Sequence, residues 1–426
     1  MWSEIRGYPL QAFSVCVIAY MFTQVDLALF AYALPAIRED FAVSLKTMGW
    51  VIAGAYTLGG ILQVWMGHLT DRVGRKFMLQ FSTVTSSLFI AAHAFAPHLA
   101  ILAVLRGCAI ATGGAMYPVT GAVVTEEAPA RYRGIMNGLL QTGYPIGWFV
   151  ASLFAAPLLV LFGWRVLFLV GFLSIPYVFV IRRYLNETGR FAAEKAQRLT
   201  LDSRPPVTVR ELFAPGMRDR TILLFVAQYL FVIAYGGSSF FFPTYFVEAR
   251  GIALDSTAYL VGIGNAIGVL GYILAAYVGE FYITRRTTVV IWTIIGATAF
   301  LVLVWGTSGF WDTMVMFAVM SMFFYGTAAV KFAYVAEIFP TRLRATGLAL
   351  CSSLAVNLGI ATGPLLVSYG VEALGWNLAF STVVAVPMIL AALLYLKLTP
   401  LPSGLEVEDI EGRLNSTSGI VNGNKT

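Results

Sequence analysis

Three ionisable side chains lie inside long apolar runs of this sequence. Asp26 falls in the run 11–36, Arg106 in the run 99–122 and Lys331 in the run 313–335. Such a group in the middle of a bilayer is costly unless it is paired or hydrated, so it usually marks a functional site. The chemistry that these residue types offer is proton transfer at a carboxyl group and anion binding at a cation.

Asp26 and Arg106 are candidates for a coupled pair. Their runs cross the bilayer in opposite directions, and both residues lie slightly outside the midplane. A carboxylate beside a guanidinium stays ionised, and a substrate anion that competes for Arg106 would free Asp26 to take a proton. Two alternatives stay open: a permanent structural ion pair, and an Asp26 that only caps a kink near Pro35.

Lys331 has two interpretations. It lies well inward of the centre of its run, where a lysine can extend to the bilayer surface or attract an anion into an inward-facing cavity. The other candidates for substrate contact are uncharged, and each could instead bond a neighbouring helix. They are Gln24, Gln141, Tyr144, Gln228, Tyr235, Ser239, Asn265, Tyr325 and Asn357.

The composition is that of a polytopic membrane protein. The chain has 426 residues, of which 58% are hydrophobic and only 12% charged, with a mean hydropathy of +0.78. Water-soluble proteins carry about twice that charge. With roughly 20 residues per span there is room for about twelve helices. We therefore expect a lipid-embedded all-α chain, without a nucleic-acid partner.

The apolar runs fall into two sets of six, separated by a polar stretch. This predicts a first six-helix half over 1–185, a cytoplasmic linker over 186–220, a second half over 221–400 and a cytoplasmic tail over 401–426. The expected spans are 11–36, 48–67, 77–96, 99–122, 135–162, 164–183, 221–247, 256–280, 287–307, 313–335, 346–371 and 376–397.

The distribution of cations predicts the orientation. With both termini in the cytoplasm, 22 of the 28 Lys and Arg residues lie in cytoplasmic segments and only Arg38, Lys46, Arg165 and Arg250 lie outside. Short loops rich in Lys and Arg resist translocation. We expect a cell membrane protein, located in the inner membrane if the source is bacterial.

An internal repeat supports two related halves. Glu126, Pro129, Arg131 and Arg133 recur 211 residues later, and Gly163, Trp164 and Phe168 recur 212 residues later. Halves of six spans that are related by an axis along the membrane normal are typical of transporters that rock around a central site.

A polar stretch between two of the runs carries a known signature. Residues 67–76 read G-H-L-T-D-R-V-G-R-K, and we expect a tight, charged turn there, outside the hydrocarbon. The stretch resembles the G-x-L-x-D-R-x-G-R-K signature of the major facilitator superfamily of transporters. The resemblance extends over almost the whole chain and implies the twelve-helix fold of that superfamily, in which helices 1 and 4 line the cavity.

Shorter pieces resemble the organic-acid:proton symporters of that superfamily, including the aromatic-acid, sialate and metabolite families. They are residues 337–347, residues 163–168 and residues 24–27. The resemblance implies proton-coupled symport of a small carboxylate by alternating access. One departure is Met116, which occupies a place where those symporters usually carry an acid, so a proton site with two carboxylates is not implied.

The charged loops are expected to control conformation. Asp71 can approach the positive N-terminal end of helix 11 and hold the halves together when the cytoplasmic side is shut. We expect Arg75, Glu126 and Arg133 to join that network, with Glu337 and Arg344 as its weaker mirror. The predicted gating set is Gly67, Asp71, Arg72, Gly74, Arg75, Glu126, Arg133, Glu337 and Arg344.

Two other transport functions stay open, and an enzyme is not expected. Residues 143–147 partly resemble a signature of drug:proton antiporters, which suggests an exporter of drugs or metabolites, and neutral sugars or metabolites share this fold. The sequence has no P-loop, zinc motif or nucleophile elbow. We expect no cofactor or metal, and a monomer whose partners are protons, a small organic anion and lipid.

Overall fold

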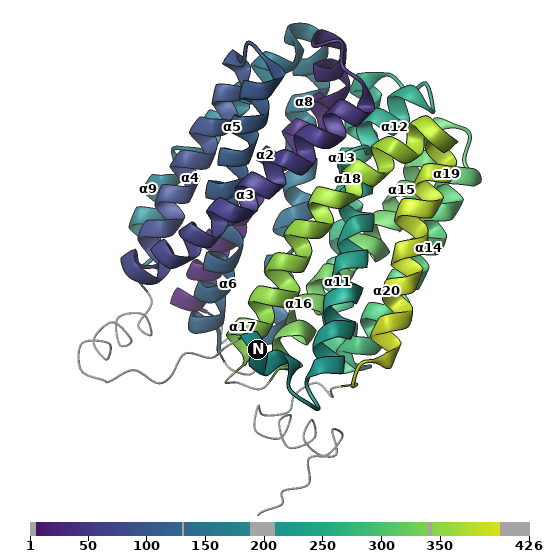
Figure 1. The fold of residues 1–426 in the computed structure, drawn as a ribbon. Coiled ribbons are helices and arrows are strands. Elements are labelled where there is room, and N and C mark those ends of the chain that lie inside the picture. The colour runs from purple at the N-terminus through teal and green to yellow at the C-terminus, as the bar shows by residue number, and fades with distance from the viewer. Residues whose placement is uncertain (1–5, 130–131, 188–208, 340–342, 401–426) are drawn as a thin grey trace, which may run out of the picture.

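The described residues form helices and no strand, and these helices make twelve spans in two sets of six (Figure 1). The computed structural model describes residues 6–129, 132–187, 209–339 and 343–400. This confirms the predicted all-α fold with two six-helix halves. The central part of the expected linker and the expected tail lie outside the described residues.

In the first half, several spans consist of two or three consecutive helical segments. The segments are α2 (Tyr8–Asp40), α3 (Leu45–Val73), α4 (Arg75–Ala92) with η1 (His93–Phe95), α5 (Leu99–Gly114) with α6 (Met116–Glu127), α7 (Arg133–Leu140) with α8 (Gly143–Phe168), and η3 (Leu169–Ser174) with α9 (Tyr177–Tyr184). The fifth span ends at Gly163 inside α8, and the last residues of α8 begin the sixth span.

The second half repeats this pattern after the short η4 (Val209–Phe213). Its segments are α11 (Arg218–Ser239), α12 (Phe242–Glu248), α13 (Leu254–Phe281), α14 (Arg285–Trp305), α15 (Phe310–Phe324) with η5 (Tyr325–Thr327) and α16 (Ala328–Glu337), α17 (Arg344–Leu348) with η6 (Ala349–Leu354) and α18 (Ala355–Leu374), and α19 (Trp376–Phe380) with η7 (Ser381–Ala385) and α20 (Val386–Lys397).

The lengths and hydropathies of these helices suit a membrane. Among the described residues, nine continuous helices are long and apolar enough to cross one, and the helix over Gly134–Tyr184 contains two spans. The helices α3 and α4 supply the remaining two spans of the twelve.

The prediction of a ten-residue turn over 67–76 is wrong, because the turn in the structure is much shorter. The helix α3 continues to Val73, and α4 begins at Arg75, so the chain reverses at Gly74 alone, with φ at 104°. Nothing in residues 67–73 prevents a helix, because charged side chains are tolerated once the helix has left the hydrocarbon. The signature is therefore mostly the end of a helix.

The internal repeat is visible in the backbone. Gly163 and Gly375 each precede a tryptophan, and their φ angles are 76° and 78°. Residues other than glycine rarely adopt such angles, so both halves turn between their last two spans with the same backbone device. Each of these turns ends one span and begins the next within very few residues.

Helix α8 packs closely against the part of α2 that carries Gln24 and Asp26. A methyl group added at Gly147 of α8 would lie 2.6 Å from the carbonyl oxygen of Met21 and 2.6 Å from Cβ of Gln24. A backbone atom cannot retreat without moving its helix. Gly147 therefore fixes how closely α8 approaches the segment that carries Gln24 and Asp26.

We expect Gly147→Ala to lower the thermal stability of the purified protein. Overpacking of this kind costs about 1–3 kcal/mol. The matched control is Gly54→Ala, because Gly54 is an exposed helical position with open space around its Cβ. The melting temperature in detergent should fall for Gly147→Ala and stay level or rise for Gly54→Ala. Equal melting temperatures for both variants would contradict the close packing.

Candidate functional site

A large cavity of about 1340 Å³ lies between the two halves. We call the end of the bundle where Tyr8 and Lys397 lie the terminal end, and the end with Asp40 and Gly163 the opposite end (Figure 1). The lining includes Glu126 and Glu337, which are at or next to the last residues of α6 and α16 at the terminal end. Toward the opposite end it stops near Tyr56 and Arg106. The cavity is therefore reached from the terminal end.

Contacts between the halves close the opposite end. Arg38 pairs with Glu248, and the Lys46 ammonium lies 2.6 Å from the Glu372 carboxylate. The indole N–H of Trp50 donates a hydrogen bond of 3.2 Å to the hydroxyl oxygen of Tyr369. Gly49 contributes by close approach, since a methyl group there would overlap Ser368.

This closure was missed in the sequence. The sequence predicts only that Arg38 and Lys46 lie outside the membrane. Their acidic partners are more than 200 residues away in the chain. The sequence contains no local signal for such pairs.

Asp26 and Arg106 both line the cavity and lie next to one another. Asp26 is 6% exposed and Arg106 is 3% exposed. The Arg106 guanidinium donates a hydrogen bond of 3.4 Å to the backbone carbonyl oxygen of Asp26. No ion pair within 4.0 Å joins the side chains of these two residues. The alternative of a permanent structural ion pair is therefore not what the structure contains.

The Arg106 guanidinium has unused donor capacity. Its Cζ lies 4.4 Å from the centre of the Phe30 ring, and this cation–π contact offsets part of the cost of burying it. One terminal nitrogen, Nη2, is buried without a hydrogen-bond partner. A buried donor of this kind is costly to leave unmet, and because Arg106 is a lining residue, an acceptor that enters beside its guanidinium would be favoured.

Three tyrosines cluster at the junction of the two halves. Tyr144 of α8 contacts Tyr235 of α11 and Tyr325 of η5, with ring centres 5.6 and 5.4 Å apart, and Tyr235 lies 5.7 Å from Tyr325. All three line the cavity. Gln228, also on the wall, has a buried side-chain oxygen without a partner.

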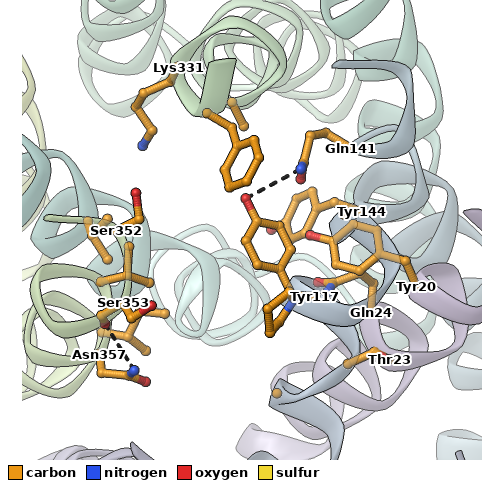
Figure 2. Close-up of a pocket in the computed structure, with 18 of the residues that line it drawn as sticks. Tyr20, Thr23, Gln24, Tyr117, Gln141, Tyr144, Lys331, Ser352, Ser353 and Asn357 are labelled. Atoms are coloured by element: carbon orange, nitrogen blue, oxygen red, sulfur yellow. Dashed lines mark hydrogen bonds between the residues drawn. The ribbon is translucent and has the colours of Figure 1, made fainter. Parts of the chain in front are cut away.

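Figure 2 shows how polar side chains from both halves face the cavity. Tyr117 lies near the centre, where Gln141 donates a bond of 3.3 Å to its hydroxyl and Phe332 of α16 packs on its ring at 5.6 Å. Tyr20 contacts Tyr117 from α2, with ring centres 5.7 Å apart. Tyr20, Tyr117 and Phe332 are absent from the predicted set, because the sequence does not distinguish them from aromatic residues that face lipid or a neighbouring helix.

A chain of hydrogen bonds between amide groups connects the two halves along the cavity wall. Gln63 of α3 donates to the carbonyl of Gly114 at 2.7 Å, and Asn357 of α18 donates to the Gln63 side-chain oxygen at 3.4 Å. Asn357 also donates to the carbonyl of Ser353 at 3.0 Å. We call this chain the amide bridge.

The predicted set of uncharged substrate contacts divides into two groups. The residues that line the cavity are Gln24, Gln141, Tyr144, Gln228, Tyr235, Tyr325 and Asn357. Ser239 and Asn265 are outside the described lining, because Ser239 lies behind Tyr325 at 3.2 Å from its hydroxyl, and Asn265 donates to the carbonyl of Val261 at 2.8 Å. Both are buried and bond neighbouring groups.

Lys331 is a lining residue and does not extend to the bilayer surface. Its ammonium lies 3.6 Å from the centre of the Phe231 ring. Figure 2 shows the side chain pointing into the cavity.

At the terminal end, each half has an ion pair in the equivalent place. Arg75 of α4 lies 3.3 Å from Glu126 of α6, and Arg285 of α14 pairs with Glu337 of α16. Arg285 also lies 2.6 Å from Glu280. In the second half, the counterpart of the Arg75–Glu126 pair is therefore Glu337 with Arg285, whereas we expected Glu337 with Arg344. It was missed because Arg285 belongs to the weakened copy of the signature.

Glu187 ties the end of the sixth span to the signature. Its carboxylate accepts bonds of 2.8 and 3.2 Å from the backbone N–H groups of Arg75 and Lys76, the first residues of α4. These N–H groups have no partner within their helix, and an acid at this position also favours the helix dipole. Gly74, which precedes them, allows the turn that exposes both donors.

The rest of the predicted gating set is only partly described. Gly67, Asp71, Arg72, Arg133 and Arg344 lie in helical backbone, and their side chains are outside the described part of the structure. The expected contact of Asp71 with the start of helix 11 therefore stays a prediction.

Comparisons with known proteins agree with this architecture. The sequence matches the Major Facilitator Superfamily over residues 16–281 and 269–420. It is 28% identical to the niacin transporter NiaP of Acinetobacter baylyi, over 86% of this chain and 89% of that protein. It is 29% identical to the 3-(3-hydroxy-phenyl)propionate transporter of Escherichia coli, over 83% and 84%. It is 25% identical to the 4-hydroxybenzoate transporter PcaK of A. baylyi, over 89% and 88%.

A solved structure shares the fold. The D-xylose-proton symporter superposes with a TM-score of 0.73 at 17% identity, over 92% of this chain and 98% of that one. Together with the sequence match, this identifies a multi-pass membrane transporter and excludes an enzyme. The chain belongs to the major facilitator superfamily.

Proposed function

We propose that this protein carries a small aromatic carboxylate across the membrane together with protons, by alternating access. The observation that carries the proposal is the buried Arg106 guanidinium of the cavity wall, which has an unmet donor and is hydrogen-bonded to the backbone carbonyl of Asp26, another lining residue. Arg106 binds the carboxylate, and Asp26 takes the proton. Charge-assisted bonds between guanidinium and carboxylate are among the strong ones in proteins.

The lining supports an aromatic substrate. Tyrosine and phenylalanine side chains from both halves surround the polar groups, and flat rings pack well against such surfaces. Niacin, 4-hydroxybenzoate and 3-(3-hydroxyphenyl)propionate, which appear in the names of the three relatives described above, are all carboxylic acids with an aromatic ring. The uncharged contacts that we propose are Gln24, Gln141, Tyr144, Gln228, Tyr235, Tyr325 and Asn357.

The cation distribution supports a cytoplasmic terminal end. In the topology predicted from the sequence, 22 of the 28 Lys and Arg residues fall in cytoplasmic segments, and the positive-inside rule favours a cytoplasmic location for both termini. In this orientation the cavity is open to the cytoplasm and closed to the outside. The conformation is then the one that releases an imported substrate.

Uptake into proteoliposomes tests the function. Purified protein is reconstituted and offered radiolabelled benzoate, 4-hydroxybenzoate or nicotinate, with an imposed inward proton gradient. We expect accumulation that collapses when a protonophore is added. Expulsion of preloaded acid against an inward proton gradient would favour the antiporter, and uptake of xylose without uptake of acids would favour a neutral symporter.

The closed opposite end gives a prediction about alternating access. Exposed ion pairs are worth about 0.2–1 kcal/mol each. We expect the double variant Glu248→Gln, Glu372→Gln to open the opposite end more often, by about two- to tenfold. The measurement is the labelling rate of Ile110→Cys, on the cavity wall, by a membrane-impermeant maleimide added from outside to a background without native cysteines.

The matched control breaks an ion pair at the same end within one half. Arg165 lies 2.7 Å from Asp40, and both belong to the first half. Arg165→Gln should leave the labelling rate of Ile110→Cys unchanged. If the control and the double variant accelerate labelling equally, the inter-half pairs have no special part in closure.

A further inference from the structure

Lys331 is a cation in the cavity without a counter-charge. No hydrogen bond or ion pair joins its ammonium to another described residue, and its contact is the face of the Phe231 ring at 3.6 Å. A lysine held on an aromatic face and directed into a cavity keeps its donors free for an anion.

Lys331 is far from Arg106 along the membrane normal. Arg106 lies seven residues after Leu99, and Lys331 lies 21 residues after Phe310, where both spans begin at the opposite end. At 1.5 Å per residue the backbones of the two cations differ in depth by about 20 Å. Their side chains also lie in different surroundings, since the Lys331 ammonium is on the Phe231 ring of α11 and the Arg106 guanidinium is on the Phe30 ring of α2. We therefore treat the two cations as separate positions for a carboxylate.

The other lining cation at the terminal end is already neutralised. Arg285 is bound by Glu337 and by Glu280, on either side of its guanidinium. Among the described lining residues, this leaves Lys331 as the cation near the terminal mouth that can take a carboxylate. The acids Glu126, Glu280 and Glu337 also face this part of the cavity, and all three are engaged with arginines.

The surroundings of Lys331 suit an aromatic acid. Ser352 comes from the π-helical segment η6, and in Figure 2 its hydroxyl and the Lys331 ammonium point toward each other across the cavity. Phe332, next to Lys331, forms the edge-to-face pair with Tyr117 that reaches from one half to the other. A carboxylate at Lys331 and Ser352 would thus have aromatic surface beside it for its ring.

We propose that Lys331 and Ser352 form a second carboxylate site, near the terminal mouth, which the substrate occupies after it leaves Arg106. This inference rests on the proposed function, since it concerns the same substrate. The two sites act in sequence: Arg106 holds the anion deep in the cavity, and Lys331 holds it where the cavity meets the cytoplasm. The Lys331 site therefore governs affinity on one face of the membrane.

The test compares the two faces of the membrane. Transport of 4-hydroxybenzoate is measured in right-side-out and inside-out vesicles carrying the wild type, Lys331→Gln or Lys331→Arg. We expect Lys331→Gln to raise KM at the terminal face by about tenfold, the loss of one charge-assisted contact, and to leave KM at the opposite face within about twofold. Lys331→Arg, which keeps the charge, should restore most of the terminal-face affinity.

The control for general surface charge is Lys397→Gln. Lys397 is an exposed cation at the same end, on the last turn of α20 and outside the described lining. It should leave both KM values unchanged. An equal rise in KM at both faces, or no rise at either, would overturn the second site. If the wild type carries none of benzoate, 4-hydroxybenzoate and nicotinate, the proposed function itself fails, which is a separate result.

Discussion

Replacing Arg106 by glutamine should abolish transport of aromatic acids. The variant removes the guanidinium of a lining residue, whose buried Nη2 has no hydrogen-bond partner and whose other terminal nitrogen donates to the Asp26 carbonyl. Truncating one partner of a buried, hydrogen-bonded charge pair costs about 2–5 kcal/mol. We therefore expect kcat/KM for 4-hydroxybenzoate uptake to fall by about 30- to 5000-fold.

Arg106→Lys separates charge from geometry. Lysine keeps the positive charge but cannot bind a carboxylate with two parallel N–H groups, so we expect only partial recovery. The matched control is Arg218→Gln, since Arg218 is an exposed arginine at the start of α11. Melting curves of each variant, with and without 4-hydroxybenzoate, check that the fold is intact. A folded Arg106→Gln protein that still transports the acid would remove Arg106 from the binding site.

Replacing Asp26 by asparagine should uncouple transport from protons without stopping it. Asparagine resembles the protonated carboxyl in shape, but it cannot release a proton. We expect counterflow exchange of 4-hydroxybenzoate to persist, while accumulation driven by an imposed proton gradient falls to the equilibrium ratio. Both are measured in the same proteoliposomes, so a loss of folding would reduce both together.

Asp219→Asn is the matched control for the removal of an acid. Asp219 is exposed in the first turn of α11 and pairs with its neighbour Arg218. Its replacement should leave accumulation intact. Full accumulation by Asp26→Asn would show that another group carries the proton.

The fold could be predicted well from the sequence because a bilayer imposes one simple rule. Each span must be a long apolar helix, so runs of apolar residues mark the spans directly. The exact ends could not be predicted, because a helix is free to continue into water. Residues 67–73 illustrate this, since their charges suggested a turn and the helix passes through them to Gly74.

The site could be predicted only where a residue is anomalous in its surroundings. Asp26, Arg106 and Lys331 stood out as ionisable groups in apolar runs, and all three line the cavity. Asn265 stood out in the same way, yet it bonds its own helix. A span that is apolar all round does not reveal which side faces the cavity, because the hydrophobic pattern carries no direction.

Contacts between residues that are far apart in the chain could not be predicted from the sequence either. Gln63 was overlooked, although it connects the two halves through Asn357. The repeat relates equivalent positions in the two halves, but it does not tell which positions touch across the interface. That information depends on how the halves pack.

The amide bridge has a consequence for how fast the carrier can cycle. The bond between Gln63 and Asn357 joins two neutral groups at 3.4 Å, beside a cavity that admits water. A neutral bond of this kind contributes about 0.5–1.5 kcal/mol, since water can replace either partner. At the position of Gln63 and Asn357, the hydrogen bond between the halves therefore adds only a small energetic cost to their separation. A charged pair in the same place would hold one conformation longer and slow each turnover.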